Sequence, residues 1–272
     1  MRIAYQGEPG AYSEAAALTY SPHADTLPCK TFDDVFEAVV QKKATHGVLP
    51  MENSIGGTIH RNYDLLVDHE IAITGEVELD VIHCLQALPG TKVEDVTIVY
   101  SHPQALAQCE RYLKDLRVTV EAVYDTAGGA KLVAEQHLKN AAALASRRAA
   151  EVFGLEVLQE AVQDFEFNIT RFFVIGGAPP ADANKTTIVF ALPSTPGSLF
   201  KALSVFALRD INLSKLESRP IRGRPWEYLF YVDIEARRDD LPLARALTQL
   251  GQFAKWIRVL GTYKGWERSK VT

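Results

Sequence analysis

Residues 47–58 read GVLPMENSIGGT, an apolar run followed directly by a polar, glycine-rich cluster. A short apolar run bounded by turn residues is typical of a buried strand. Ser, Thr, Asn and Gly after such a strand can turn the chain and cap the first turn of a helix. Because this unit recurs along the first two-thirds of the chain, the sequence predicts an α/β fold.

The other apolar runs of this region are rich in Val, Ile and Ala. They predict strands at residues 3–6, 47–50, 97–100, 118–123 and 141–145, with helices between them. One helix is expected to begin at Thr31, whose hydroxyl can cap while Asp34 lies at the positive end of the helix dipole. Ile71–Ile82 differs, because apolar and polar residues alternate along it; a long strand there could cross between two lobes.

The last third of the chain follows a different order. Gly176–Asp182 (GGAPPAD) has the composition of a linker, so we place a domain boundary there, between residues 1–180 and 185–272. Beyond it the pattern predicts strand, helix, strand, strand, helix and strand at residues 186–192, 197–209, 213–219, 228–234, 241–254 and 257–263. This is the βαββαβ order of a ferredoxin-like module, with both helices on one face of the sheet.

Composition excludes several classes of function. The 272 residues carry a formal charge of -5 without clustered Lys or Arg, which argues against nucleic acid and anionic membrane as partners. No signal-peptide pattern and no apolar stretch of spanning length occurs, so a cytoplasmic protein is expected. The widely spaced Cys29, Cys84 and Cys109 suit neither a disulfide framework nor zinc, and single scattered histidines predict no metal. Without a G-x-G-x-x-G fingerprint, no nucleotide cofactor is expected.

Five polar clusters lie where a predicted strand gives way to a helix. The carboxyl ends of strands line the ligand crevice of an open α/β sheet, and helix N-termini there suit a carboxylate or phosphate. Any one cluster could be an ordinary helix cap, but their recurrence favours a binding crevice. Within them His102 is either a general base or a hydrogen-bonded structural residue. The clusters are residues 7–13, 52–58, 101–104, 125–129 and Ser146.

Six motifs, in this order, resemble those of the prephenate dehydratase family. They are YQGEPGAYSE (5–14), PMENSIGG (50–57), SHPQAL (101–106), DTA (125–127), TRF (170–172) and ESRP (217–220). The resemblance spans nearly the whole chain, and the ferredoxin-like tail resembles the family's ACT domain. It implies two α/β lobes like those of periplasmic binding proteins, an active site in the cleft between them, and a following ACT domain.

The resemblance also implies an activity. The enzyme would be a decarboxylating carbon–oxygen lyase that converts prephenate to phenylpyruvate in phenylalanine biosynthesis without a cofactor. Thr170 takes the family's role of proton donor to the leaving hydroxyl. Arg171 either reaches a substrate carboxylate or braces Thr170, and strand alternation favours bracing; Phe172 would pack near the ring. The remaining substrate contacts are expected at Asn53, Ser54, Gly56, Ser101, His102, Gln104, Thr126 and Ala127.

Phenylalanine is implied as the effector, bound between ACT domains of different subunits. Such a site requires a homodimer or a homotetramer, and the sequence does not choose between them. Residues 197–200 depart from the usual Gly-Ala-Leu pattern of the family. The effector contacts are expected at Gly197, Ser198, Leu199, Glu217, Ser218, Arg219 and Pro220.

Two rival functions stay open. An arogenate dehydratase performs the same chemistry on a substrate with an amino group where prephenate has a keto oxygen. Residues 125–130 are expected near the substrate and bear on that choice. A non-enzymatic amino-acid-binding regulator could share both the bilobed fold and the ACT domain. The intact Thr170–Phe172 motif argues against this second rival.

Overall fold

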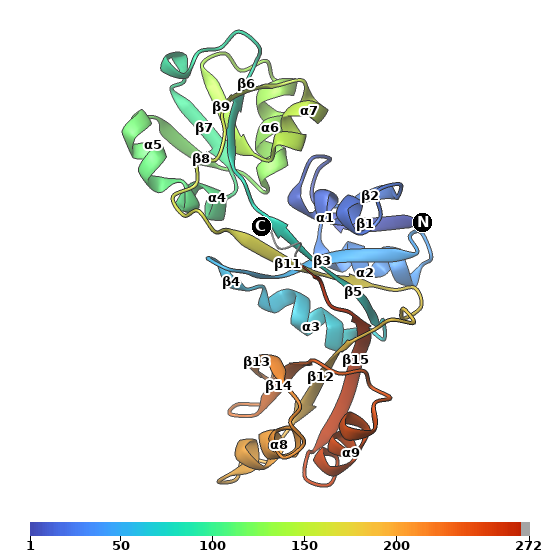
Figure 1. Cartoon of the computed structure of the whole chain (residues 1–272). Coiled ribbons are helices and arrows are strands. Elements are labelled where there is room, and N and C mark those ends of the chain that lie inside the picture. The colour runs from blue at the N-terminus through green and yellow to red at the C-terminus, as the bar shows by residue number, and fades with distance from the viewer. Residues whose placement is uncertain (268–272) are drawn as a thin grey trace. The chain divides into compact units, whose positions relative to one another are not determined.

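The computed structural model describes residues 1–267. They form two compact units (Figure 1). The first comprises Met1–Leu65 and Val77–Phe173, and the second comprises Leu66–Glu76 and the chain from Val174 onward. Two strands, β5 (Ile73–Asp80) and β11 (Ile169–Ile175), therefore contribute residues to both units.

One lobe of the first unit is built on a mainly parallel sheet. Strand β1 (Arg2–Gln6) lies between β2 (Asp25–Cys29) and β3 (His46–Asn53) and is parallel to both, while the short β4 (Gly57–Thr58) pairs antiparallel with β3. β11 is the next strand beyond β3. The helices of this lobe are α1 (Tyr12–Tyr20), α2 (Phe32–Val40) and α3 (His60–Asp68).

The other lobe of the first unit is a five-stranded sheet. Its order is β10 (Glu156–Gln159), β6 (Cys84–Ala87), β9 (Ala141–Ala145), β7 (Ile98–Ser101) and β8 (Thr119–Ala122). β7 is parallel to β8 and β9, whereas β6 is antiparallel to β9 and β10. A short 3-10 helix (Val93–Asp95) precedes β7, and the α-helices are α4 (Pro103–Gln108), α5 (Glu110–Leu116), α6 (Thr126–Glu135) and α7 (Arg147–Phe153).

The two-lobed α/β prediction is confirmed. The chain enters the second lobe where β5 leads into β6 and returns where β10 leads towards β11, so the predicted crossing strand at residues 71–82 is β5. The capping box at Thr31 is also present: Thr31 Oγ1 accepts a hydrogen bond from Asp34 N at 3.1 Å, and Asp34 Oδ2 accepts one from Thr31 N at 2.9 Å. Because both bonds satisfy N–H groups with no partner inside the helix, α2 begins there.

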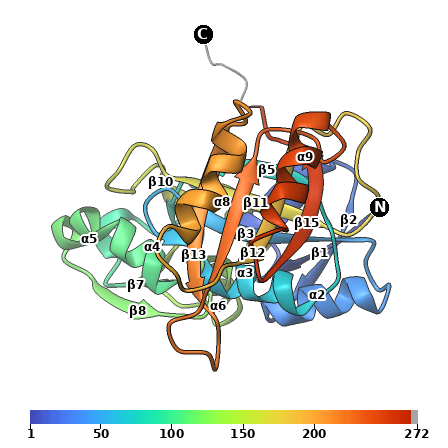
Figure 2. The same cartoon turned by 90° about the horizontal axis from the view of Figure 1, so that it is seen from below.

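The second unit has the predicted βαββαβ order. Its elements are β12 (Lys185–Ala191), α8 (Ser198–Ala207), β13 (Leu213–Pro220), β14 (Tyr228–Ile234), α9 (Leu241–Leu250) and β15 (Trp256–Lys264). Strand β12 lies between β14 and β15 and is antiparallel to both, and β13 pairs with β14. Figure 2 shows α8 and α9 side by side over the sheet. Val205 and Phe206 of α8 and Leu243 and Ala246 of α9 share one core with Phe190 of β12, so burial of both apolar helix faces holds the module together.

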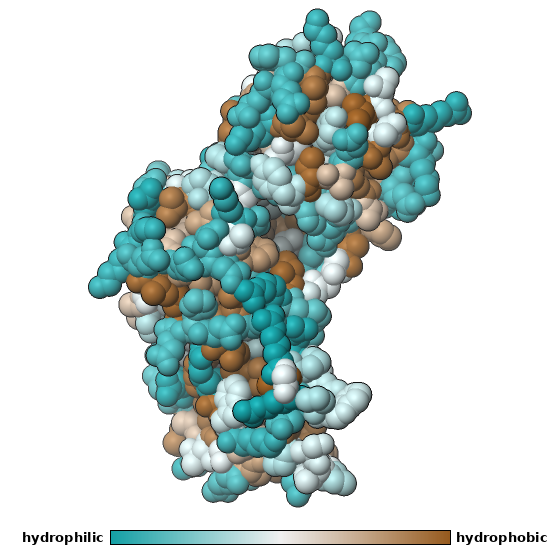
Figure 3. All heavy atoms as spheres, turned by 180° about the vertical axis from the view of Figure 1, so that it is seen from behind, coloured by the Kyte–Doolittle hydropathy of each residue, from teal (hydrophilic) through white to brown (hydrophobic). Residues whose placement is uncertain are grey.

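The surface seen in Figure 3 is mainly hydrophilic, with hydrophobic atoms in scattered groups. Single exposed apolar side chains are ordinary on a folded protein. Within residues 1–267 no helix is long and apolar enough to cross a membrane.

Candidate active site

A cavity of about 210 Å³ lies in the first unit, where the carboxyl ends of β3 and β7 approach the segments that open α1 and α6. Both lobes contribute to its wall. Of the residues predicted to bind substrate or to act in catalysis, six line it: Asn53, His102, Gln104, Thr126, Thr170 and Phe172. The structure therefore gathers side chains from four separate motifs, as expected where strand ends meet a crevice.

Strand alternation determines which part of the TRF motif faces the cavity. Thr170 and Phe172 are buried and line it, whereas Arg171 is half-buried and does not line it. The Arg171 guanidinium carbon lies 4.6 Å from the centroid of the Phe173 ring, within the range of a cation–π contact. The bracing of Thr170 by Arg171 stays a prediction, because the contact described here is with Phe173.

Four other predicted contacts lie outside the cavity lining. Ser101 is fully buried, and its Oγ donates to the Leu144 carbonyl at 2.6 Å, while Ala127 is buried in the core of the second lobe. Ser54 Oγ accepts a hydrogen bond from Ile169 N at 3.0 Å. Gly56 lies so close to the Gln104 amide that any side chain there would collide with it. These residues shape the wall, and substrate contact by them remains a prediction.

Asn53 places the Thr170 hydroxyl. Asn53 Nδ2 donates to Thr170 Oγ1 at 3.0 Å and to Asn168 Oδ1 at 2.7 Å. Its Oδ1 accepts from the backbone N–H groups of Ile55 and Gly56, at 3.1 and 2.7 Å. Because the Thr170 oxygen is the acceptor in this contact, its own hydrogen is available to a ligand in the cavity.

The network continues from Asn53 to a buried histidine. Gln108 Nε2 donates to Asn53 Oδ1 at 3.3 Å, and Gln108 Oε1 accepts from Asn168 Nδ2 at 2.9 Å. His83 Nε2 lies 2.8 Å from the same Gln108 oxygen, so Nε2 carries a hydrogen. The donors therefore run in one direction, from His83 through Gln108 and Asn53 to Thr170. Burial lowers the pKa of His83, and the hydrogen bond to Gln108 opposes that shift.

Sequence reasoning missed His83, Gln108 and Asn168. His83 is a single histidine just before a four-residue strand and forms no recognisable motif. Gln108 lies four residues after Gln104, a spacing that places both amides on one face of a helix, and this was the available signal. Asn168 directly precedes the strand that carries Thr170.

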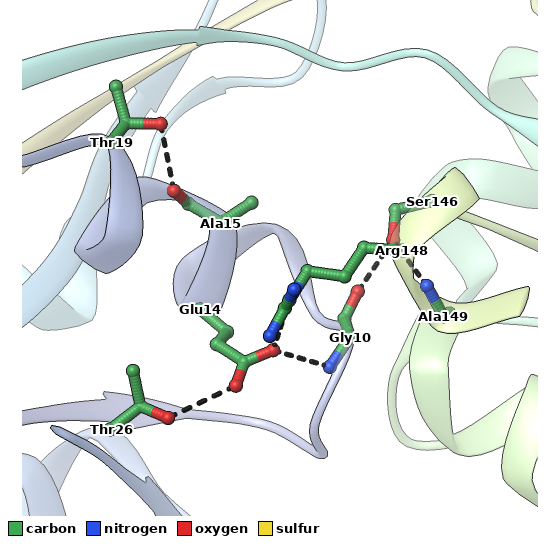
Figure 4. A network of polar contacts seen from close by, with 8 residues as sticks. All are labelled: Gly10, Glu14, Ala15, Thr19, Thr26, Ser146, Arg148 and Ala149. Carbon is green, nitrogen blue, oxygen red and sulfur yellow. Dashed lines mark hydrogen bonds and ion pairs between the residues drawn. The ribbon is translucent and has the colours of Figure 1, made fainter. Parts of the chain in front are cut away.

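The two lobes of the first unit are bridged near this cavity by a second polar network, drawn in Figure 4. Glu14 Oε2 accepts from Arg148 Nε and from Gly10 N, both at 2.8 Å, and Thr26 Oγ1 donates to Glu14 Oε1 at 3.1 Å. Ser146 Oγ donates to the Gly10 carbonyl at 2.6 Å. Burial tends to raise the pKa of Glu14, but its hydrogen bonds to Arg148 and Gly10 outweigh this and lower the pKa overall.

The charge of the cavity wall is unusual for a site that is expected to hold a dianion. Among the residues of 1–267 that line it, none is a Lys or an Arg, and Asp125 is the sole carboxylate. Burial lowers the pKa of His102, which favours the neutral imidazole. The wall therefore offers neutral donors and one acidic group.

A second cavity, of about 420 Å³, lies in the second unit and is lined in part by Ser198, Leu199, Tyr228 and Phe230. Gly197 precedes α8 with a φ of 78°, a left-handed conformation that favours glycine. The predicted effector residues Glu217, Ser218, Arg219 and Pro220 lie on β13, where Ser218 pairs with Phe230 and Pro220 with Tyr228. The start of α8 thus lines a cavity together with β14, the strand that pairs with β13.

A bilobed α/β region with a polar cleft, followed by a βαββαβ module, defines a small-molecule protein with an ACT-type regulatory domain. The family model described as prephenate dehydratase matches residues 3–180, and the ACT domain model matches residues 186–252. The chain belongs to the prephenate dehydratase family.

Two similar proteins carry names of this family, and one similar solved structure is named for a different activity. Arogenate dehydratase/prephenate dehydratase 2, chloroplastic, of Arabidopsis thaliana is 50% identical over 276 residues, covering 97% of this chain and 72% of the relative. A prephenate dehydratase from Arthrobacter aurescens, solved in complex with L-Phe, gives a TM-score of 0.88 at 30% identity and covers 97% of this chain and 90% of that one. A structure titled as GqqA, a novel type of quorum quenching acylase, gives a TM-score of 0.90 at 36% identity, with 98% of each chain covered.

The names of the plant relatives correct one prediction. Three similar Arabidopsis thaliana proteins are called chloroplastic. These names point to the plastid, so the expectation of a cytoplasmic protein is wrong. The absence of a signal-peptide pattern argued against export and did not distinguish the cytoplasm from an organelle.

Among residues 1–267 no group of three or more His, Cys, Asp or Glu side chains is arranged to hold a metal ion.

Proposed function

We propose that the first unit catalyses the decarboxylating dehydration of prephenate to phenylpyruvate, or the same reaction of arogenate. The observation that carries the proposal is the Thr170 hydroxyl, which faces a polar cavity while its oxygen accepts a hydrogen bond from Asn53. Such a hydroxyl can donate to an oxygen that leaves the substrate. Membership of the prephenate dehydratase family supports this reaction class.

The electron flow of the reaction explains what the site has to do. The bond between the ring and its carboxylate breaks and releases CO₂, and its electron pair moves into the ring. The ring becomes aromatic as the C4–oxygen bond breaks, and the hydroxyl leaves as water once it receives a proton. One positioned donor for that proton contributes about 10² to 10⁴ in rate.

Thr170 is a weak acid, so it requires assistance. As its proton shifts towards the leaving oxygen, negative charge develops on Oγ1, where the Asn53 amide already donates a hydrogen bond. Donors that point the same way from His83 through Gln108 polarise one another and strengthen that bond. We propose that this buried chain supplies the electrostatic assistance for the transition state.

We propose further that residues 1–180 form the catalytic domain and residues 185–272 a regulatory ACT domain that responds to phenylalanine. The related Arthrobacter aurescens enzyme solved with L-Phe supports phenylalanine as the effector. The second cavity and the neighbouring β13 are the expected contact surface, completed by another subunit of a homodimer or homotetramer. Phenylalanine would act by binding a less active state more tightly than the active one.

The direct test is to incubate the purified protein with prephenate, and separately with arogenate, and to measure phenylpyruvate and phenylalanine as the products. Conversion of either substrate supports the proposal. If the protein binds these compounds but converts neither, a non-enzymatic amino-acid-binding regulator becomes the better account.

A further inference from the structure

The two candidate substrates differ in charge, and the charged groups of the cavity wall suit one of them better than the other. Prephenate carries two carboxylates and no positive group, whereas arogenate carries the same carboxylates and one ammonium. A site for the more negative compound would be expected to offer a cation, yet within residues 1–267 no Lys or Arg lines the cavity. Asp125 instead places a carboxylate at the wall, which repels a dianion and attracts an ammonium.

Asp125 is held firmly in this position. It is the N-cap of α6, and its Oδ1 accepts a hydrogen bond from Gly128 N, while its Oδ2 accepts one from Glu8 N at 3.1 Å. An ionised carboxylate accommodates about four hydrogen bonds, so both oxygens can accept more. Because the cap and the Glu8 backbone restrain the carboxylate, little ordering is needed when a ligand binds.

The lysine whose charge interacts with this carboxylate is already paired with another acid. Lys131 is paired with Glu8 at 3.2 Å, and the Tyr124 hydroxyl donates to the same Glu8 at 2.8 Å. Burial raises the pKa of Asp125, an effect that a bound ammonium would offset. His102 lies on the same wall, and its charge lowers the pKa of Asp125.

We propose that Asp125 recognises the α-amino group of the substrate and makes arogenate the preferred substrate of this chain. The inference rests on the proposed dehydratase function and adds the residue that determines its specificity. The keto oxygen of prephenate would face the same carboxylate with lone pairs and no hydrogen to donate. A site built to bind an N–H group rejects an analogue that lacks it. Two arogenate dehydratases of Petunia hybrida among the similar proteins, 50% and 49% identical to this chain, agree with this choice.

Asp125 also caps α6, which by itself accounts for its position. The test must therefore distinguish the loss of the helix cap from the loss of the negative charge. Asp125→Asn removes the charge and keeps an oxygen that can cap α6, since Asn and Asp cap helices equally well. Glu8→Gln is the matched control, because it removes a negative charge from the same corner without altering a residue that lines the cavity.

The experiment measures kcat/KM for arogenate and for prephenate with the wild type and both variants, together with their melting temperatures. The wild type is expected to favour arogenate. Asp125→Asn should lower kcat/KM for arogenate about 10- to 100-fold, the scale of one lost charged hydrogen bond, and leave the value for prephenate unchanged or raised. Glu8→Gln should change the ratio of the two values by no more than about threefold.

Three results would overturn the assignment. An equal loss for both substrates in Asp125→Asn would reduce the residue to a structural cap, and a wild type that prefers prephenate, with an unchanged ratio in the variant, would exclude ammonium recognition. If the wild type converts neither substrate, both the proposed function and the specificity assignment fail. An active enzyme whose ratio of kcat/KM values is unchanged by Asp125→Asn would contradict the specificity assignment alone.

Discussion

The walls of the two cavities described above differ in burial and in polarity. In the first unit the wall is anchored by a buried network in which Asn53, Gln108 and Asn168 satisfy one another and His83. In the second unit the wall includes Trp226, which is 81% exposed, and the nearby Phe200 is 76% exposed. A buried polar network fixes geometry, whereas exposed apolar side chains remain available to a partner or ligand. This difference agrees with the proposal that catalysis uses the first cavity and regulation the second.

The largest expected effect comes from the hydroxyl at the end of the network. Thr170→Val keeps the shape of the side chain but removes the proton donor, so kcat should fall about 10² to 10⁴-fold. KM should change little, because the lost interaction belongs to the transition state. Steady-state kinetics with both substrates measure this, with Thr170→Ser as the control that restores a hydroxyl. A defect confined to KM would contradict the donor role.

The next effect tests whether the far end of the network reaches Thr170. His83→Phe removes the hydrogen that Gln108 accepts, and kcat should fall about 10-fold, the scale of one hydrogen bond in a buried network. The exposed His23 provides the control variant His23→Phe. An unchanged kcat in a folded His83→Phe protein would show that the chain of donors ends at Gln108.

A substitution in the second cavity should affect regulation alone. Leu199→Asp replaces an apolar side chain of the wall by a carboxylate, which should raise the phenylalanine concentration for half-maximal effect about 10-fold. Without phenylalanine, kcat should stay within about twofold of the wild type. Phenylalanine titration of the activity, with calorimetry of binding, measures both quantities. A loss of activity in the absence of phenylalanine would contradict the proposal that the second cavity serves regulation alone.

The smallest effect concerns the contact between the lobes of the first unit. The pKa of Glu14 is lowered in the folded protein, so its contribution is fully present above its ordinary value of 4.5 and is lost as pH falls through the folded pKa. Glu14→Gln should therefore lower the free energy of unfolding by about 1–2 kcal/mol near pH 7, since Arg148 is partly exposed. Denaturant unfolding should show the stabilities of the two proteins converging as the pH falls through the lowered folded pKa of Glu14. A constant difference at every pH would point to packing instead of charge.

Much of the fold follows from local pattern. The strand at Ala141–Ala145 and the capped helix after Thr31 were predicted because apolar runs and capping chemistry are encoded within a few residues. Strands β2, β4, β6 and β10 were missed; β2 contains Pro28, and β4 is only two residues long. Their pairing depends on partners that are distant in sequence, which no local pattern reveals.

The residues of the candidate site also fall into two groups, those that the sequence could identify and those that it could not. Asn53, Gln104 and Thr170 lie within motifs, so the sequence could name them. His83 and Asn168 act through Gln108, which joins segments 25 and 60 residues away from it. Hydrogen-bond partners that are distant in sequence can be identified only in the folded chain, because their geometry produces no regular spacing of residues in the sequence.

Strand β11 has a mechanical consequence. Its first residues, including Thr170 and Phe172, belong to the first unit, and Val174 and Ile175 belong to the second. Four residues of extended strand separate Thr170 from Val174, a span of about 13 Å at the usual rise per residue. A paired strand has no slack, whereas a glycine-rich tether would absorb motion. A twist of β11 at Val174 and Ile175 would therefore change the orientation of the Thr170 side chain, which is expected to donate the proton.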